Sequence, residues 1–81
     1  MTKNIQFTIL VRINKRLHEF NFRKRSDEKY DGDTGDDWGN RHYFNLLLID
    51  NEWAIQGDKL PDWIWQNEEF IIEEFEKMQA D

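Results

Sequence analysis

A pair of turn-forming residues, Asp50 and Asn51, separates two apolar runs within residues 42–57, and this arrangement constrains the fold more than any other feature. Two extended runs joined by two such residues are typical of a β-hairpin. Side chains alternate between the two faces of a strand. The predicted pairing therefore places five apolar side chains on one face, namely Phe44, Leu46, Leu48, Trp53 and Ile55.

A second hairpin is predicted at the N-terminal end of the chain. Apolar residues occupy alternate positions from Ile5 to Ile13, as expected for a strand with one buried face. With Asn14 and Lys15 in the turn, or with a longer loop over 14–17, the apolar faces of both strands coincide. The predicted pairs are Val11 with His18, Ile9 with Phe20 and Phe7 with Phe22.

The C-terminal segment has the spacing of an amphipathic helix. A single helical stripe contains Ile64, Ile71, Phe75 and Met78. Pro61 suits the first position of a helix, because its missing N–H would have no intrahelical partner there. Asn67 suits the cap of a second helical segment, with acidic residues following it near the positive end of the helix dipole.

Residues 25–40 have no periodic apolar face and contain three of the four glycines, so they are predicted to form a loop. The predicted fold over residues 1–81 is a single α+β domain with a four-stranded antiparallel sheet, made of two consecutive β-hairpins. A C-terminal amphipathic helix packs on one face of this sheet. We expect strands at about 4–13, 16–24, 41–49 and 52–56, and the helix at about 61–79.

Composition predicts a small, soluble, cytoplasmic protein. The chain has no cysteine and no apolar segment of the roughly 18 residues that would span a membrane. Its net charge is −6, but residues 1–25 carry seven basic residues against one acidic residue. We expect the two oppositely charged parts to attract each other in the folded chain. Either a monomer or a homodimer is compatible with this size.

Closely spaced acidic residues suggest a calcium site as one alternative function. The ligands would be four carboxylates in the 31–37 segment, namely Asp31, Asp33, Asp36 and Asp37. Calcium takes six to eight oxygen ligands, and carboxylates in a glycine-containing loop can supply them. The EF-hand pattern is incomplete, however, because Gly35 stands where a ligand belongs and His42 replaces the bidentate glutamate.

Basic residues on the first hairpin suggest weak binding of single-stranded nucleic acid as another alternative. Arg12, Arg23 and Arg25 would face outward, with Tyr43 as the only neighbouring aromatic residue for base stacking. The acidic net charge disfavours this function. His18 and His42 are possible general bases, but Ser26 is the only serine and no nucleophilic motif accompanies it. We therefore predict no enzymatic activity and no cofactor.

The tryptophans outside the core suggest a protein-interaction or accessory module, which is the function we favour from the sequence. Trp63 and Trp65 are two residues apart, so a helix cannot bury both of them. Trp38 lies in the predicted acidic loop. Aromatic residues surrounded by charged ones are typical of protein interfaces. Trp38, Trp63 and Trp65, beside the acidic helix, are thus the predicted contact for an unknown protein partner.

Overall fold

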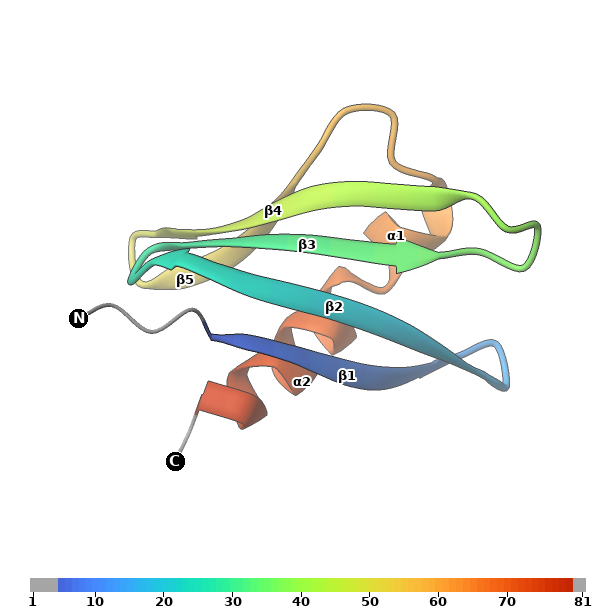
Figure 1. The fold of residues 1–81 in the computed structure, drawn as a ribbon, viewed down its shortest axis with the longest axis horizontal. Helices are drawn as coiled ribbons and strands as arrows, with labels where there is room; N and C mark the ends of the chain where they lie inside the picture. Colours follow the sequence, from blue (N-terminus) through green and yellow to red (C-terminus); the bar gives the residue numbers. More distant parts are fainter. Residues whose placement is uncertain (1–4, 80–81) are drawn as a thin grey trace.

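The computed structural model describes residues 5–79, which form an antiparallel sheet and two helices (Figure 1). The sheet has five strands in sequence order, and each strand pairs with the next. The strands are β1 (Gln6–Ile13), β2 (Arg16–Ser26), β3 (Lys29–Gly35), β4 (Arg41–Ile49) and β5 (Glu52–Gln56). The helices are α1 (Asp62–Gln66) and α2 (Glu68–Gln79). The predicted α+β class with an antiparallel sheet and a C-terminal helix is confirmed.

Both predicted hairpins are present with their predicted registers. Val11 pairs with His18 in the first hairpin, and Leu48 pairs with Trp53 in the second. Each turn consists of two residues in the left-handed region, with φ of 51° and 67° at Asn14 and Lys15 and of 52° and 66° at Asp50 and Asn51. Positive φ at both central positions is the geometry that matches the twist of the flanking strands.

The prediction of four strands is wrong, because β3 lies within the segment expected to be a loop. β3 pairs with β2 on one side and with β4 on the other, so it separates the two predicted hairpins. Its sequence, KYDGDTG, is rich in aspartate and glycine, which are depleted in strands generally. Tertiary contacts rather than local propensity therefore account for this strand.

Three inward-facing residues of β3 explain how the strand is held. Tyr30 is buried in the core, and Thr34 is buried with its hydroxyl donating to the carbonyl oxygen of Glu19 at 2.7 Å. Gly32 leaves room for the ring of Phe44, since a Cβ at this position would lie 2.5 Å from Phe44 Cε2. β3 thus contributes the Tyr30 ring to the core, and Gly32 leaves a space that the Phe44 ring of β4 fills.

The helical segment divides at Asn67, where the predicted second cap lies. The Asn67 side-chain amide donates to the Trp63 carbonyl at 2.7 Å, and its own carbonyl accepts the first α2 hydrogen bond, from Ile71. The Glu68 carboxylate accepts from the backbone N–H of Ile55 at 2.9 Å, which ties α2 to the edge of β5. Among residues 5–79, neither helix has the length and apolar content that crossing a bilayer requires.

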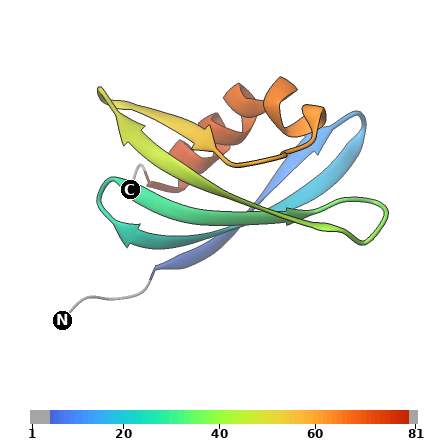
Figure 2. The same cartoon turned by 90° about the horizontal axis from the view of Figure 1, so that it is seen from above.

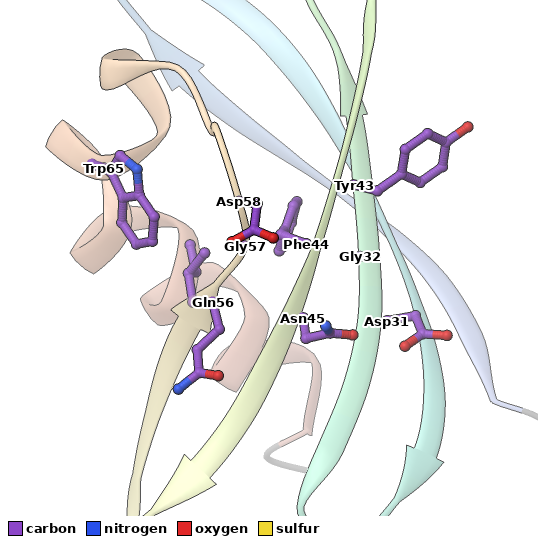
Figure 3. Close-up of a pocket in the computed structure, with 10 residues that line it drawn as sticks. Asp31, Gly32, Tyr43, Phe44, Asn45, Gln56, Gly57, Asp58 and Trp65 are labelled. Atoms are coloured by element: carbon purple, nitrogen blue, oxygen red, sulfur yellow. The ribbon is translucent and has the colours of Figure 1, made fainter.

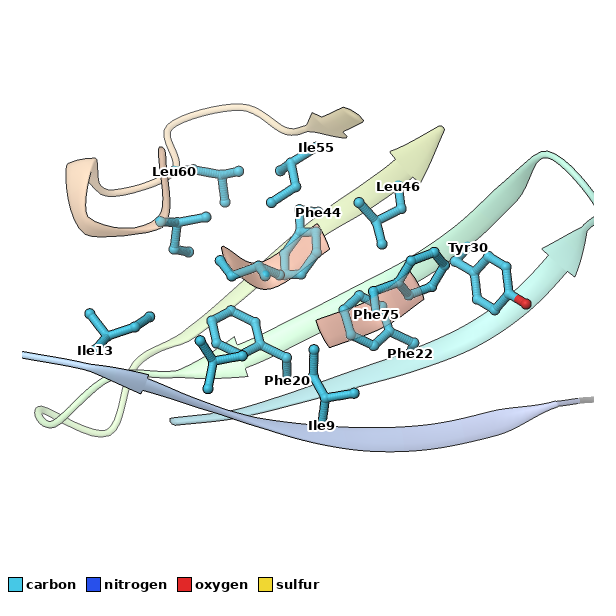
Figure 4. Close-up of a cluster of buried hydrophobic side chains, with 13 residues drawn as sticks. Ile9, Ile13, Phe20, Phe22, Tyr30, Phe44, Leu46, Ile55, Leu60 and Phe75 are labelled. Atoms are coloured by element: carbon cyan, nitrogen blue, oxygen red, sulfur yellow. The ribbon is translucent and has the colours of Figure 1, made fainter. Parts of the chain in front are cut away.

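The sheet curls around α2, and the core lies between them (Figure 2). Ile71 and Phe75 of α2 are fully buried against the inner face of the sheet, as is Ile64 of α1. The Phe75 ring contacts four aromatic rings, with centroid distances from 4.8 to 5.8 Å. Figure 4 shows this cluster of buried side chains, which extends from Ile13 at one end of the sheet to Tyr30 near the other.

Candidate functional site

The turn between β3 and β4 is built around the carboxylate of Asp36. This carboxylate accepts hydrogen bonds from the backbone N–H groups of Trp38 and Asn40, both at 2.9 Å. The Asn40 side chain donates to the same carboxylate at 3.3 Å, and the backbone N–H of Asp36 donates to the Asn40 carbonyl at 3.0 Å. We call this segment, residues 36–40, the Asp36 turn. Its conformation is defined by hydrogen bonds within the turn itself.

A histidine from the adjacent strand completes the hydrogen bonding of Asp36. The Nε2 atom of His42 lies 3.0 Å from Asp36 Oδ2, and both side chains are largely shielded from solvent. Burial on its own would raise the pKa of Asp36. The hydrogen bonds from Asn40, His42 and Trp38 outweigh that effect and lower the pKa to about 2. Asp36 is therefore a carboxylate at all but strongly acidic pH.

Trp38 extends from the Asp36 turn into solvent with 86% of its surface exposed. An ion pair between Arg16 and Asp37, at 2.5 Å, connects the turn to the start of β2. Beside the indole lies a recess of about 260 Å³. Its lining comprises Ile13, Asn14, Arg16, His18, Asp36, Asp37, Trp38 and Trp63.

Of the three tryptophans predicted to share a surface, the structure brings together only Trp38 and Trp63. Trp63 packs at the end of the core, with its ring centroid 4.8 Å from that of His18 and 6.4 Å from that of His42. Trp63 is partly buried and lines the recess. Trp65 is more exposed and lines a different groove.

This second groove, of about 760 Å³, arises where β5 leaves the sheet. Pairing between β4 and β5 ends at Asn45 and Gln56, and the chain then turns away at Gly57. Figure 3 shows Trp65 and Gln56 on one side of the groove, with β4 and β3 on the other. The full lining is Asp31, Gly32, Tyr43, Phe44, Asn45, Ile55, Gln56, Gly57, Asp58 and Trp65.

The four predicted calcium ligands do not converge. Three of them form ion pairs with different arginines: Asp31 with Arg25, Asp33 with Arg41 at 2.8 Å, and Asp37 with Arg16. The fourth, Asp36, is bound within its own turn. Across residues 5–79, no group of three or more histidine, aspartate or glutamate side chains is arranged to hold a metal ion. The acidic segment instead forms ion pairs that involve the basic N-terminal part of the chain.

The three predicted nucleic-acid contacts are also dispersed. Arg12 lies opposite Leu17 on β2, and Arg23 lies six residues further along that strand, roughly 20 Å away. Arg25 is held by Asp31, and Arg23 lies opposite the same aspartate in the β2–β3 register. This part of the sheet's outer face therefore alternates in charge.

The histidines and the serine lie at opposite ends of the sheet. The rings of His18 and His42 both lie beside the ring of Trp63, near the start of β2. Ser26 is the last residue of that strand. The predicted candidates for nucleophilic catalysis are therefore not brought together.

Sequence reasoning missed the Asp36 turn, although an aspartate followed by Gly39 and Asn40 is a turn signal. No family model, curated protein or solved structure significantly matches the chain.

Proposed function

We propose that the protein is a non-catalytic protein-interaction module that binds its partner through Trp38 and the surrounding Asp36 turn. The observation that carries this proposal is the 86% exposure of an indole on a turn held by its own hydrogen bonds. Tryptophan is enriched among the residues that dominate binding energy at protein interfaces, and a rigidly held, exposed indole can insert into a recess of a partner.

The ordering of the turn matters as much as the exposure of the ring. Association normally costs free energy because mobile loops and side chains lose conformational freedom. Here the backbone of the turn is already held by the hydrogen bonds that the Asp36 carboxylate accepts from the N–H groups of Trp38 and Asn40. A buried tryptophan removes roughly 200 Å² from water, which corresponds to a gross gain of about 5 kcal/mol. The partner we propose is a protein surface with an apolar recess that receives this ring.

The calcium and single-stranded nucleic-acid alternatives have less support. Each candidate carboxylate already has a hydrogen-bonding or ion-pair partner within the chain. Asp31 lies on the outer face opposite Arg23 and forms an ion pair with Arg25, two of the arginines that would contact a phosphate backbone. Trp65 lies outside the surface around Trp38, so the contact we propose is narrower than a surface made of three tryptophans.

Affinity capture from extracts of the native cells, quantified by mass spectrometry, tests this proposal. The bait is the intact chain, compared with Trp38→Ala and with Tyr43→Ala, which removes an exposed aromatic ring from the outer face of the sheet. Both rings are exposed, so we expect each variant to keep its stability within about 0.5 kcal/mol. A partner recovered by the wild type and Tyr43→Ala but reduced at least tenfold with Trp38→Ala supports the proposal. Equal recovery with Trp38→Ala refutes it.

A further inference from the structure

Among residues 5–79, no strand pairs with the outer edge of β1, where a row of backbone groups points away from the sheet. In an antiparallel pair with a two-residue turn, alternate residues direct their N–H and C=O groups toward the partner strand. The hydrogen bond from the Lys24 N–H to the Ile5 carbonyl shows that the odd-numbered residues of β1 direct their backbone groups toward β2. The even-numbered residues therefore direct theirs toward the open edge, and these are Gln6, Thr8, Leu10 and Arg12.

Exposed apolar side chains accompany this edge on the outer face of the sheet. Leu10 is 54% exposed, and Leu17, its diagonal neighbour on β2, is 58% exposed. β1 spans eight residues with no proline, no bulge in its pairing with β2 and no inward-pointing charge. Those are among the devices by which sheet edges are normally protected from pairing, and Arg12 is the only charged residue in β1. The opposite edge differs, because β5 has five residues and Glu68 binds the outward N–H of Ile55.

The inner side of the same edge is flanked by exposed apolar residues of α2. Glu68 and Ile72 lie on one side of the buried Ile71–Phe75 stripe, and the bond from Ile55 to Glu68 shows that this side faces β5. Helical periodicity then places Phe70 and Met78 on the other side, toward β1. Phe70 is 62% exposed, and Met78 is also exposed.

We propose that β1 pairs antiparallel with β1 of a second copy of this chain, about a two-fold axis at Leu10. In this register, Leu10 pairs with Leu10 of the second copy and Arg12 pairs with its Thr8. Each of these residues directs its backbone N–H and C=O toward the other copy, so the hydrogen-bonding groups are complementary. Leu10 and Leu17 of both copies then form one apolar cluster. Like charges do not meet, since the two copies of Arg12 are roughly 14 Å apart. On the inner side, the flank of α2 that carries Met78 and, further from the sheet, Phe70 lies toward the partner copy.

Sedimentation velocity over about 10 µM to 1 mM, on the intact chain, tests this dimer. The wild type is expected to show a dimer whose fraction rises with concentration. Leu10→Lys places a charge on the free edge without disturbing a buried side chain, and we expect it to remain monomeric throughout. Ile49→Lys is the matched control, because it changes an exposed apolar residue beside the β4–β5 turn, and it should dimerise like the wild type.

Amide hydrogen exchange identifies the surface used. In the dimer, the N–H groups of Thr8, Leu10 and Arg12 should exchange at least tenfold more slowly than in Leu10→Lys, while other β1 amides change little. A wild type that is monomeric at 1 mM overturns the proposal. So does a dimer that forms without protection of these three amides, or that Ile49→Lys disrupts as strongly as Leu10→Lys.

Discussion

Replacing Gly32 with alanine tests the packing that allows β3 to form a strand. A Cβ at this position would lie 2.5 Å from Cε2 and 2.7 Å from Cζ of Phe44. The Phe44 ring is buried, and the rings of Phe20 and Phe22 lie 6.3 and 6.0 Å from it. Because these neighbours occupy the space into which the ring would move, the added methyl group overpacks the core.

The expected cost follows from two opposing contributions. Forcing an extra carbon into a packed core typically costs about 1–3 kcal/mol. Removing glycine from the middle of a strand recovers about 0.5–1 kcal/mol. We therefore expect Gly32→Ala to lower the free energy of unfolding by about 1–2 kcal/mol. For a domain of this size, that corresponds to a decrease in Tm of roughly 5–15 °C.

Urea unfolding monitored by tryptophan fluorescence measures this change, and Gly35→Ala is the control. Gly35 lies in the same strand but faces outward, and its added Cβ would meet only the flexible end of the Arg41 side chain, at 2.8 Å. Gly35→Ala should be neutral or slightly stabilising. Phe44→Leu should relieve the overpacking, so that the double variant is more stable than the sum of the single effects predicts. Equal stability of Gly32→Ala and Gly35→Ala would refute the reasoning.

Three further predictions concern the core, the Asp36 turn and the edge of β5. Phe75→Ala should lower the free energy of unfolding by about 3–5 kcal/mol in urea titrations, whereas the exposed Phe70→Ala should change it by less than about 0.5 kcal/mol. Asp36 has a pKa of about 2, below its ordinary value of 3.8. Its contribution to stability is therefore complete above about pH 4 and is lost as the pH falls toward 2. The stability of Asp36→Asn, measured by circular dichroism, should depend less on acid pH than that of the wild type. Glu68→Ala should cost about 1–3 kcal/mol and accelerate amide exchange at Ile55, and unchanged exchange would contradict the hydrogen bond between them.

The parts of the fold that could be predicted from sequence are those in which local pattern and tertiary structure agree. Alternating apolar residues and two-residue turns determined the registers of both hairpins, because a shift by one residue would expose the apolar face. β3 could not be predicted in this way. Its inner face contains one aromatic residue, a glycine and a threonine, and the contacts that stabilise it come from Phe44 and Glu19 on neighbouring strands.

The sequence analysis singles out Trp38 but not the hydrogen-bonded Asp36 turn that carries it. Trp38 was identified as a contact because it lies among charged residues. Once β3 forms, however, the acidic segment is extended, and its aspartates are directed toward Arg16, Arg25 and Arg41 instead of toward one another. The groove beside Trp65 begins where β5 ends at Gln56, as the predicted strand at about 52–56 does, but the sequence pattern does not show that Trp65 lies beside this point.

The proposed function requires that the Asp36 turn present Trp38 in a defined conformation. Backbone ¹⁵N relaxation on the picosecond-to-nanosecond timescale measures this property directly for residues 29–40. We predict order parameters of about 0.85 through β3 and across the Asp36 turn, equal to those of the neighbouring strands. Values below about 0.6 from Asp36 to Asn40 would show a mobile loop and would contradict the account.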